Sequence, residues 1–318
     1  MKEDSYSIQE ATESDLTGIA NFFKQENFVL REEHLLRWKY FSNPAGPPRI
    51  LMVTNGSTDP IGILTFMPRE FKTPSGHTIM LMQAVDAFFS RELRGKGMLR
   101  KLIEYSKQVI HAPVYSFPNK LAENTMRKSG WKFYSEVDSW FFPIDIGQRL
   151  SGRIGRYCAP LGNLIGKMYA YIRLGGLSDD IEVARVKRFQ REIPAPTNQA
   201  WGLRSADYLN WRFIDNALKE YRCYEFFEAG ECIGYCVIGR KDANSELYDF
   251  IVWKNQKKCL RKVIEICRQD SVQYLFCRAV GVELSKMGFI KLKSLSNLIV
   301  YDLPNYPWSL MACDCDWD

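Results

Sequence analysis

The sequence predicts a mixed α/β protein of the α+β type, built from two tandem domains that each hold a mixed central sheet flanked by helices. Three observations support this fold class: an internal repeat, an alternation of strand-like and helix-like segments within each copy, and a length of 318 residues, which suits about two domains. We expect the first domain at residues 1–147, an interdomain linker at 148–180 and the second domain at 181–318.

The repeat consists of matched segments that follow one another in the same order in both copies. The segment "LLRWKYFSN" (35–43) corresponds to "YLNWRFIDN" (208–216), which places Trp38 opposite Trp211. Farther along, "QAVDAFF" (83–89) corresponds to "ELYDFIV" (246–252), and "MLRKLIEYSKQ" (98–108) corresponds to "CLRKVIEICRQ" (259–269). Because several segments match in one order, we interpret the chain as a tandem duplication. Both tryptophans lie in helical apolar patterns, which favours core positions over platforms for stacking nucleic-acid bases.

The first copy shows the element order that both copies are expected to share. A strand over 6–11 precedes a helix over 14–25, in which Leu16, Ile19, Phe22 and Phe23 share one face. Hairpin strands, a central strand over 83–89 and a helix over 98–108 follow. The expected closing strand of each copy is "SWFFPI" in the first and "IVYDLP" in the second.

The composition bounds the class of protein and its surroundings. With 46% hydrophobic and 25% charged residues, it is that of a globular protein, and no apolar run approaches the roughly 18–20 residues of a membrane span. The segment "MKEDSYSIQE" at the start carries acids where a signal peptide has basic and apolar regions, so we expect a cytoplasmic protein. A formal net charge of +6 suits anionic small molecules and is too dispersed to indicate nucleic acid.

The cysteines and histidines show no metal-binding or disulfide pattern. Nine cysteines, an odd number placed singly, predict free buried thiols. Cys313 and Cys315 lie beside Asp314 and Asp316 but lack a second ligand pair, so we expect an acidic tail and no metal site. The histidines are isolated in the sequence and are interpreted as structural: His34, His77 and His111.

Residues 147–177 join the two copies and are rich in glycine and basic residues, with enough apolar residues to lie against a surface. Two interpretations remain open: a packed interdomain linker and a helix on a membrane surface. The internal glycines and the proline weaken a continuous amphipathic helix, which favours the linker.

The segment "RELRGKGMLRKL" places two glycines directly before a predicted helix, where four backbone N–H groups lack an intrahelical partner. Gly95 and Gly97 let the backbone approach an anion without a Cβ, the helix dipole favours negative charge, and Arg94 and Lys96 add positive charge. A pyrophosphate fits such a turn. The segment lacks the Gly-Lys-Ser/Thr of nucleotide triphosphatases and the three-glycine spacing of dinucleotide-binding proteins.

On these residues the sequence resembles the GNAT superfamily of acyl-CoA-dependent N-acyltransferases, and its two copies resemble the tandem type. The family signature is Arg/Gln-x-x-Gly-x-Gly/Ala, and Leu99 stands here in place of the last small residue. A second stretch of the family, Asn-x-x-Ala followed by Gly-aromatic, is matched by Asn119, Ala122, Gly130 and Trp131. The resemblance covers most of residues 5–145 and, more faintly, 180–305. It implies that acetyl-CoA is bound by these residues: Phe88, Phe89, Arg94, Gly95, Lys96, Gly97, Met98, Leu99 and Asn119.

The catalytic groups are less defined than the coenzyme site. In the family a tyrosine that protonates the leaving thiolate often stands where this sequence has Met126; Tyr115, Tyr134 or water could replace it. Asp86 is a candidate general base, but Asp249 occupies the matching position in the other copy, which favours a structural role. Two further acids are expected to be solvated: Glu92 and Glu104. Deprotonation by water or by the substrate itself remains open.

The leading hypothesis is an acetyl-CoA-dependent N-acetyltransferase that acts on a small amine, such as an amino sugar or an amino-acid derivative. The second copy has "NQKKC" (255–259) where the first has "RGKGM", so only the first copy is expected to bind coenzyme A. One alternative is a non-catalytic module that binds coenzyme A or regulates another protein. Another is a Fem-type ligase that takes aminoacyl-tRNA, which the turn at 94–97 argues against. No metal cofactor is expected, and the oligomeric state is left open.

Overall fold

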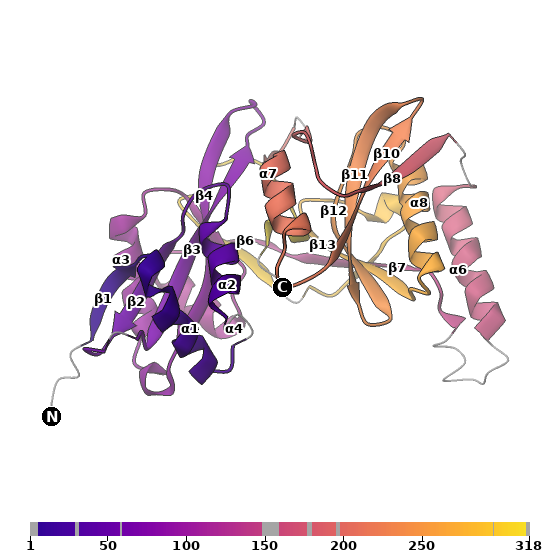
Figure 1. Cartoon of the computed structure of the whole chain (residues 1–318). Coiled ribbons are helices and arrows are strands. Elements are labelled where there is room, and N and C mark those ends of the chain that lie inside the picture. Colours follow the sequence, from indigo (N-terminus) through magenta and orange to yellow (C-terminus); the bar gives the residue numbers. More distant parts are fainter. Residues whose placement is uncertain are drawn as a thin grey trace. The chain divides into compact units, whose positions relative to one another are not determined.

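The computed structural model describes residues 6–28, 32–57, 59–147, 159–176, 180–194, 198–294 and 296–315. The chain divides into two compact units, which Figure 1 shows as ribbons coloured along the sequence. Unit 1 comprises Met1–Glu136 with Ser296–Tyr306, and unit 2 comprises Val137–Leu295 with Pro307–Asp318. Each unit has its own mixed sheet and its own hydrophobic core, as the sequence predicts.

The described strands of unit 1 form a mixed sheet in the order β1-β2-β3-β4-β5-β15-β6. Strands β4 and β5 run parallel, and the other neighbours run antiparallel. The strands are β1 (Ser7–Ala11), β2 (Arg49–Thr54), β3 (Gly62–Lys72), β4 (Thr78–Phe89), β5 (Val114–Ser116), β6 (Lys132–Glu136) and β15 (Asn297–Tyr301).

The helices of unit 1 lie in the connections between these strands. Between β1 and β2 come α1 (Leu16–Gln25) and α2 (Glu33–Leu36), which continues as a π-helix, η2 (Arg37–Phe41). Helix α3 (Met98–Val109) connects β4 to β5, and α4 (Lys120–Lys128) connects β5 to β6. The helical face predicted for α1 is confirmed by the burial of its four apolar members: Leu16, Ile19, Phe22 and Phe23.

Unit 2 repeats this arrangement with the strand order β8-β10-β11-β12-β13-β7-β14. Its parallel pair is β12 with β13, which are connected by α8 (Gln256–Gln269). A second π-helix, η5 (Asn210–Ile214), follows α7 (Ala206–Leu209). The strands are β7 (Asp138–Pro143), β8 (Ile181–Val186), β10 (Tyr221–Glu228), β11 (Glu231–Lys241), β12 (Asn244–Val252), β13 (Tyr274–Val280) and β14 (Ile290–Leu292).

Three further elements belong to unit 2. Strand β16 (Trp308–Met311) pairs with the end of β13, and β9 (Ala200–Gly202) runs parallel to β16. Helix α6 (Ala159–Leu174) lies beside α8 (Figure 1).

Each copy of the repeat completes the sheet of the other unit with its closing strand. Strand β15 comes from the second half of the sequence but lies between β5 and β6, where Val300 is opposite both Tyr115 and Lys132. Strand β7 comes from the first half but lies between β13 and β14, where Phe141 is opposite both Phe276 and Ile290. The compact units therefore differ from the expected ranges 1–147 and 181–318 at both closing strands, because β7 and β15 are exchanged.

The segments that first indicated the duplication adopt the same unusual conformation. Trp38 lies in η2 and Trp211 in η5, and each π-helix directly follows a short α-helix. Trp38 is buried, and Trp211 is partly buried against the core of unit 2, so the predicted core positions are confirmed. A π-helix is rare and strains the backbone, so its presence at both matched sites is strong evidence for two copies of one fold.

The acidic C-terminal segment is buried in unit 2 as far as Cys315. Cys313, Asp314 and Cys315 are buried in unit 2, and all eight cysteines in the described part of the chain are free buried thiols. Asp314 accepts two hydrogen bonds from the guanidinium of Arg204, at 2.6 and 2.7 Å. The acid can be buried because the guanidinium of Arg204, 110 residues away in the sequence, neutralises it. Asp316 lies outside the described residues.

Candidate functional site

The predicted anion-binding turn lies on the surface of unit 1, between a 3₁₀ turn at Arg91–Leu93 and the start of α3. Gly95 has φ +79° and Gly97 has φ +72°, which is the left-handed region that glycine tolerates best. A Cβ built on either glycine would meet no atom within 4 Å. The glycines are therefore needed for the shape of the backbone, and the space in front of them is open.

The N-terminus of α3 has no side-chain cap. Gly97 is the N-cap residue, and Met98 begins the helix. The N–H groups of the first turn of a helix have no intrahelical acceptor, and the helix dipole adds a partial positive charge there. The donors without an intrahelical acceptor are the backbone N–H groups of residues 98–100, directly after the exposed residues 94–97, and such donors suit an anion.

The two basic side chains of the turn are held in place by neighbouring residues. Arg94 donates from Nη2 to Glu26 at 2.6 Å and from Nε to the carbonyl of Phe89 at 3.2 Å. Lys96 donates from Nζ to the hydroxyl of Tyr6 at 3.0 Å. Both side chains remain exposed, so their positive charges lie at the surface beside the turn.

Strands β4 and β5 separate immediately before this turn. Their register pairs Met82 with Val114, Gln83 with Tyr115 and Ala84 with Ser116, and β4 then continues to Phe89 beside β3 alone among the described strands. Ala84 and Ser116 form the last pair of this register, and the hydroxyl of Ser116 donates to the carbonyl of Ala84 at 2.9 Å. Beyond Ala84, none of the described strands pairs with the edge of β4 that faced β5.

The unpaired edge of β4 includes the backbone N–H of Phe89. Ser90 donates its N–H to the carbonyl of Ile61 at 2.8 Å, and the antiparallel register places Phe89 opposite Gly62. Hydrogen-bonded and non-hydrogen-bonded pairs alternate in an antiparallel ladder, so Phe88 faces β3 and Phe89 faces the separated edge. Of the two residues predicted to contact the coenzyme here, Phe88 directs its N–H to β3. Phe89 directs its N–H to the other edge of β4, where none of the described strands pairs with it.

Asp86 lies at a bulge in β4, and its side chain is already engaged. Its backbone has φ +47°, at the irregularity where the β3–β4 register shifts between Ile63 and Thr65. Its Oδ2 atom accepts from the Tyr40 hydroxyl at 2.7 Å and lies 2.8 Å from the ammonium of Lys39. The side chains of Asp86 and Lys39 are only 6% and 7% exposed. This is the geometry of a buried anchor that ties η2 to β4.

Lys39 was missed by the sequence analysis, because its burial is visible only in the structure. Arg212 occupies the matching position in the second copy, and both cations are buried within their units. Two matched buried cations are unusual, because a buried charge requires a partner. The partners differ, since Lys39 pairs with Asp86, whereas Arg212 donates from Nη2 to the carbonyl of Cys315 at 3.1 Å.

The side chains considered as thiolate acids are placed differently. Tyr115 is 2% exposed, and its hydroxyl lies 3.4 Å from Oε1 of Gln83, while its ring contacts Phe71 and Phe117 edge-on. Tyr134 donates its hydroxyl to the carbonyl of Tyr306 at 3.2 Å. Met126, at the position where the family often has a tyrosine, is buried in the core of unit 1.

Asn119 caps the helix that follows the separated strands. Its Oδ1 atom accepts the backbone N–H of Ala122 at 2.9 Å, at the N-terminus of α4. The side chain is exposed, so its amide nitrogen still faces solvent. Trp131 is buried in the core of unit 1. The second stretch of the resemblance therefore contributes a helix cap and a core residue.

The corresponding region of unit 2 has no such turn. In unit 1 eight residues, 90–97, connect β4 to α3, whereas in unit 2 three residues, 253–255, connect β12 to α8. Met98 matches Cys259 in the repeat, but α8 begins three residues earlier, at Gln256. Its N-cap, Asn255, donates to the carboxylate of Glu228 at 2.6 Å. An acid therefore lies where an incoming anion would approach.

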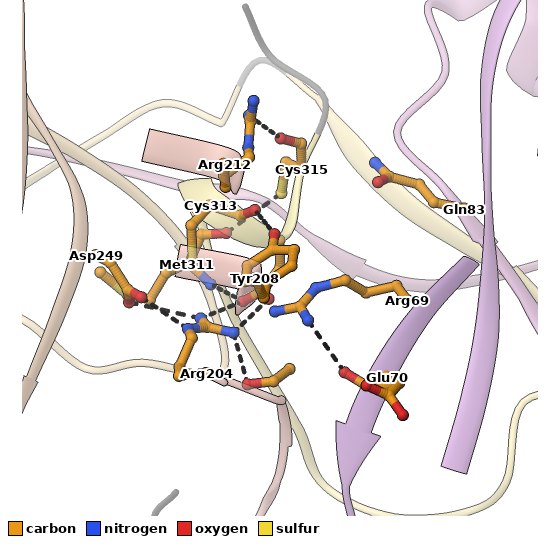
Figure 2. Close-up of polar contacts among 12 residues, drawn as sticks. Arg69, Glu70, Gln83, Arg204, Tyr208, Arg212, Asp249, Met311, Cys313 and Cys315 are labelled. Carbon is orange, nitrogen blue, oxygen red and sulfur yellow. Dashed lines mark hydrogen bonds and ion pairs between the residues drawn. The ribbon is translucent and has the colours of Figure 1, made fainter. Parts of the chain in front are cut away.

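Asp249, the match of Asp86 in unit 2, is also a buried anchor, as Figure 2 shows. The Nε atom of Arg204 donates to Asp249 at 2.7 Å, and the hydroxyl of Tyr235 donates to the same carboxylate. Burial lowers the pKa of Arg204, but Asp249 and Asp314 raise it well above its ordinary value. Burial and the neighbouring Asp249 raise the pKa of Tyr235. Arg204 thus stays charged and Tyr235 stays neutral inside unit 2.

Neither a membrane-crossing helix nor a cluster of metal ligands occurs among the described residues. The described helices include none of the length and apolar character that a membrane crossing needs. Likewise, no group of three or more His, Cys, Asp and Glu side chains in the described ranges is placed to hold a metal ion.

The chain resembles solved structures of N-acetyltransferases over almost its whole length. A GCN5-related N-acetyltransferase from Anabaena variabilis matches with a TM-score of 0.60 and 8% identity, covering 93% of this chain and 72% of that one. A tandem GNAT protein from the clavulanic acid biosynthesis pathway matches with a TM-score of 0.50 and 8% identity, covering 97% and 99%. The N-myristoyltransferase of Saccharomyces cerevisiae, solved with myristoyl-CoA, matches with a TM-score of 0.52 and 8% identity, covering 96% and 85%.

These likenesses establish the class of fold. The chain is a mixed α/β protein with two GNAT-like halves, as the motifs and the repeat predict. No protein-family model and no curated protein sequence matches the chain.

Proposed function

We propose that unit 1 binds acetyl-CoA and transfers its acetyl group to the nitrogen of a small amine. The observation that carries this proposal is the coincidence of two features at one end of β4. The edge of β4 becomes free where β5 ends, and the chain then enters an open glycine turn at an uncapped helix N-terminus. A long molecule with a pyrophosphate and an amide-containing arm can use both features at once.

The residues present fit such a coenzyme. The backbone N–H groups of the turn would hold the pyrophosphate, with Arg94 and Lys96 supplying positive charge, in a space that is open around Gly95 and Gly97. The free edge of β4 at Phe89 would accept the amide-containing arm as an added strand. The remaining residues of the proposed site are the first helical residues and the cap of α4: Met98, Leu99 and Asn119.

Acetyl-CoA supplies a thioester, which is reactive towards a neutral amine. The contribution of this chain is then to bind, to orient and to exclude water. We assign Asp86 an anchoring role, because its Oδ2 atom is already shared by Lys39 and Tyr40. Thiolates leave readily, so the burial of Met126 and Tyr115 is compatible with protonation by water.

Unit 2 would serve as a fold partner that binds no coenzyme. Its connection at 253–255 is too short for a glycine turn, and Glu228 faces the N-cap of α8. The acceptor is proposed to be a small amine, with amino sugars and amino-acid derivatives as the first compounds to test.

The test combines binding with turnover. The protein is incubated with acetyl-CoA and a panel of small amines; free coenzyme A is measured with a thiol reagent, and acetylated products are identified by mass spectrometry. Release that requires both an amine and the wild-type turn supports the proposal. Binding of acetyl-CoA without release for any amine would favour the non-catalytic module, which the absence of a tyrosine at Met126 motivates. Absence of binding would refute the proposal.

A further inference from the structure

Helix α6 is a feature of unit 2 that the proposed function leaves unused. It is a continuous helix of 16 residues, although it contains two glycines and a proline near its start. The expectation that these residues would weaken the helix was wrong, because the glycines are where the helix meets the rest of the unit. A Cβ on Gly162 would lie 2.5 Å from the Cα of Gly147, and a Cβ on Gly166 would lie 2.1 Å from the carbonyl oxygen of Ile144.

The inward face of α6 is made chiefly of small residues. Gly162, Gly166 and Ala170 follow one another at four-residue intervals and are buried. On the same side, Tyr169 donates its hydroxyl to the carbonyl of Gly288 at 2.7 Å. These contacts fix the helix on the unit. They also fix its rotation, so the orientation of its other faces is determined.

The outward face of α6 is made of large apolar side chains. At about 100° per residue they form a stripe about 120° wide, opposite the glycines. Their exposed fractions run from 43% to 73%. The stripe consists of Leu161, Leu164, Ile165, Met168, Tyr171 and Ile172.

This arrangement reverses the usual order of an amphipathic helix, in which large apolar side chains face the core. Within the unit, packing does not require the stripe, because the contacts of α6 come from the opposite face. A contiguous exposed apolar surface of this kind marks an interaction site.

The charge around the stripe indicates what covers it. Residues 147–176 contain five basic residues and no Asp or Glu. On α6, Lys167 is exposed beside the stripe, whereas Arg173 lies on the face of the glycines and donates from Nη2 to the carbonyl of Ser285 at 2.8 Å. Three more basic residues precede the helix in the sequence, outside the described residues: Arg149, Arg153 and Arg156. A helix with an exposed apolar stripe, in a segment that is positively charged throughout, matches an anionic lipid surface, which offers acyl chains below a layer of negative headgroups.

We propose that the stripe on α6 binds the surface of an anionic lipid bilayer, with the helix lying in the plane of the interface. The apolar side chains enter the boundary between headgroups and acyl chains, and Lys167 contacts the headgroups. The inference is independent of acetyl transfer, since none of its residues belongs to the turn at 94–97.

The test is flotation of the full-length protein with lipid vesicles. Vesicles of phosphatidylcholine with phosphatidylglycerol should retain the protein, whereas vesicles of phosphatidylcholine alone should bind at least about tenfold more weakly, and high salt should weaken binding further. The double variant Leu164→Glu/Ile172→Glu should lose at least about tenfold in binding to the anionic vesicles.

The matched control is Leu121→Glu, which places a carboxylate on an exposed apolar position of another helix, α4, where the side chain is 82% exposed. This variant should bind vesicles as the wild type does. Circular dichroism melting checks that each variant is folded, which is expected because every substituted side chain is exposed. The proposal is overturned if the wild type ignores anionic vesicles, or if Leu121→Glu loses as much binding as the double variant. It is also overturned if ultracentrifugation shows a lipid-free dimer that the double variant dissociates, because the stripe is then an interface between two copies.

Discussion

The proposed coenzyme site can be tested by placing one negative charge in the turn with almost no change of shape. Gly97→Asp and Gly97→Asn differ by a charge alone, and both side chains tolerate the left-handed backbone that φ +72° requires. The second copy provides a precedent, because Asn255 is the N-cap of α8 with φ +54°. No atom lies within 4 Å of the new Cβ, so neither variant creates a clash.

The expected magnitude follows from Coulomb's law. A carboxylate about 6 Å from a phosphate charge, at an effective dielectric constant of about 40, is repelled by about 1.4 kcal/mol. The pyrophosphate carries two such charges, so the Asp variant should bind acetyl-CoA about 100-fold more weakly than the Asn variant. Stability should move the other way, because a carboxylate at a helix N-terminus is stabilising by about 0.3–1 kcal/mol.

Calorimetric titration with acetyl-CoA measures the affinities, and thermal melting measures stability. The gap in affinity between the two variants should narrow at high salt, since screening weakens the repulsion. Lys258→Glu, in the matching part of unit 2, disrupts an exposed ion pair with Asp180 and should leave the affinity unchanged. Equal affinities of the Asp and Asn variants would refute the placement of the pyrophosphate at this turn.

Three further predictions concern the two units. Acetyl-CoA should bind with one-to-one stoichiometry, and two equivalent calorimetric sites would contradict the difference between the turns. Asp86→Asn and Asp249→Asn should each lower the melting temperature, with turnover of the Asp86 variant within about tenfold of the wild type; a larger loss without destabilisation would identify Asp86 as a base. Burial raises the pKa of the thiols of Cys223, Cys259 and Cys267 to about 12. The folded protein therefore keeps protons that the unfolded chain loses above about pH 8.5, so the unfolding free energy should fall as pH rises from about 9 to 12. Chemical denaturation at a series of pH values measures the unfolding free energy. A constant value over that range would contradict the burial of these three thiols.

The sequence was sufficient to predict the two related folds because the repeat is local. The match of Trp38 with Trp211 rests on segments whose helical patterns and spacing are visible within a few residues. The turn at 94–97 is likewise local, since glycine positions and a following helix define it. Features of this kind depend on backbone preferences that short segments already carry.

The features that were not predicted depend on partners distant in the sequence. Strand β7 follows the first copy directly and has the pattern of any closing strand, so nothing local indicates that its neighbours are β13 and β14. The same holds for Asp314, whose acidic surroundings suggest solvent but whose partner is Arg204. For Asp86, the repeat correctly drew attention to Asp249, but the buried cation beside each acid could be found only in three dimensions.

The differences between the two copies explain why we propose a coenzyme site in unit 1 and none in unit 2. The sheet features are retained: both parallel pairs end after three rungs, at Ala84 with Ser116 and at Leu247 with Cys277. What differs is the connection to the next helix, which has eight residues in unit 1 and three in unit 2. In unit 2 an extra helical turn occupies the sequence that aligns with the glycines, and Asn255 at its N-cap donates to the carboxylate of Glu228. The buried anchors at Asp86 and Asp249 are common to both units because they serve the shared sheet. The open turn belongs to unit 1 alone in the described structure, which is why we place the chemistry there.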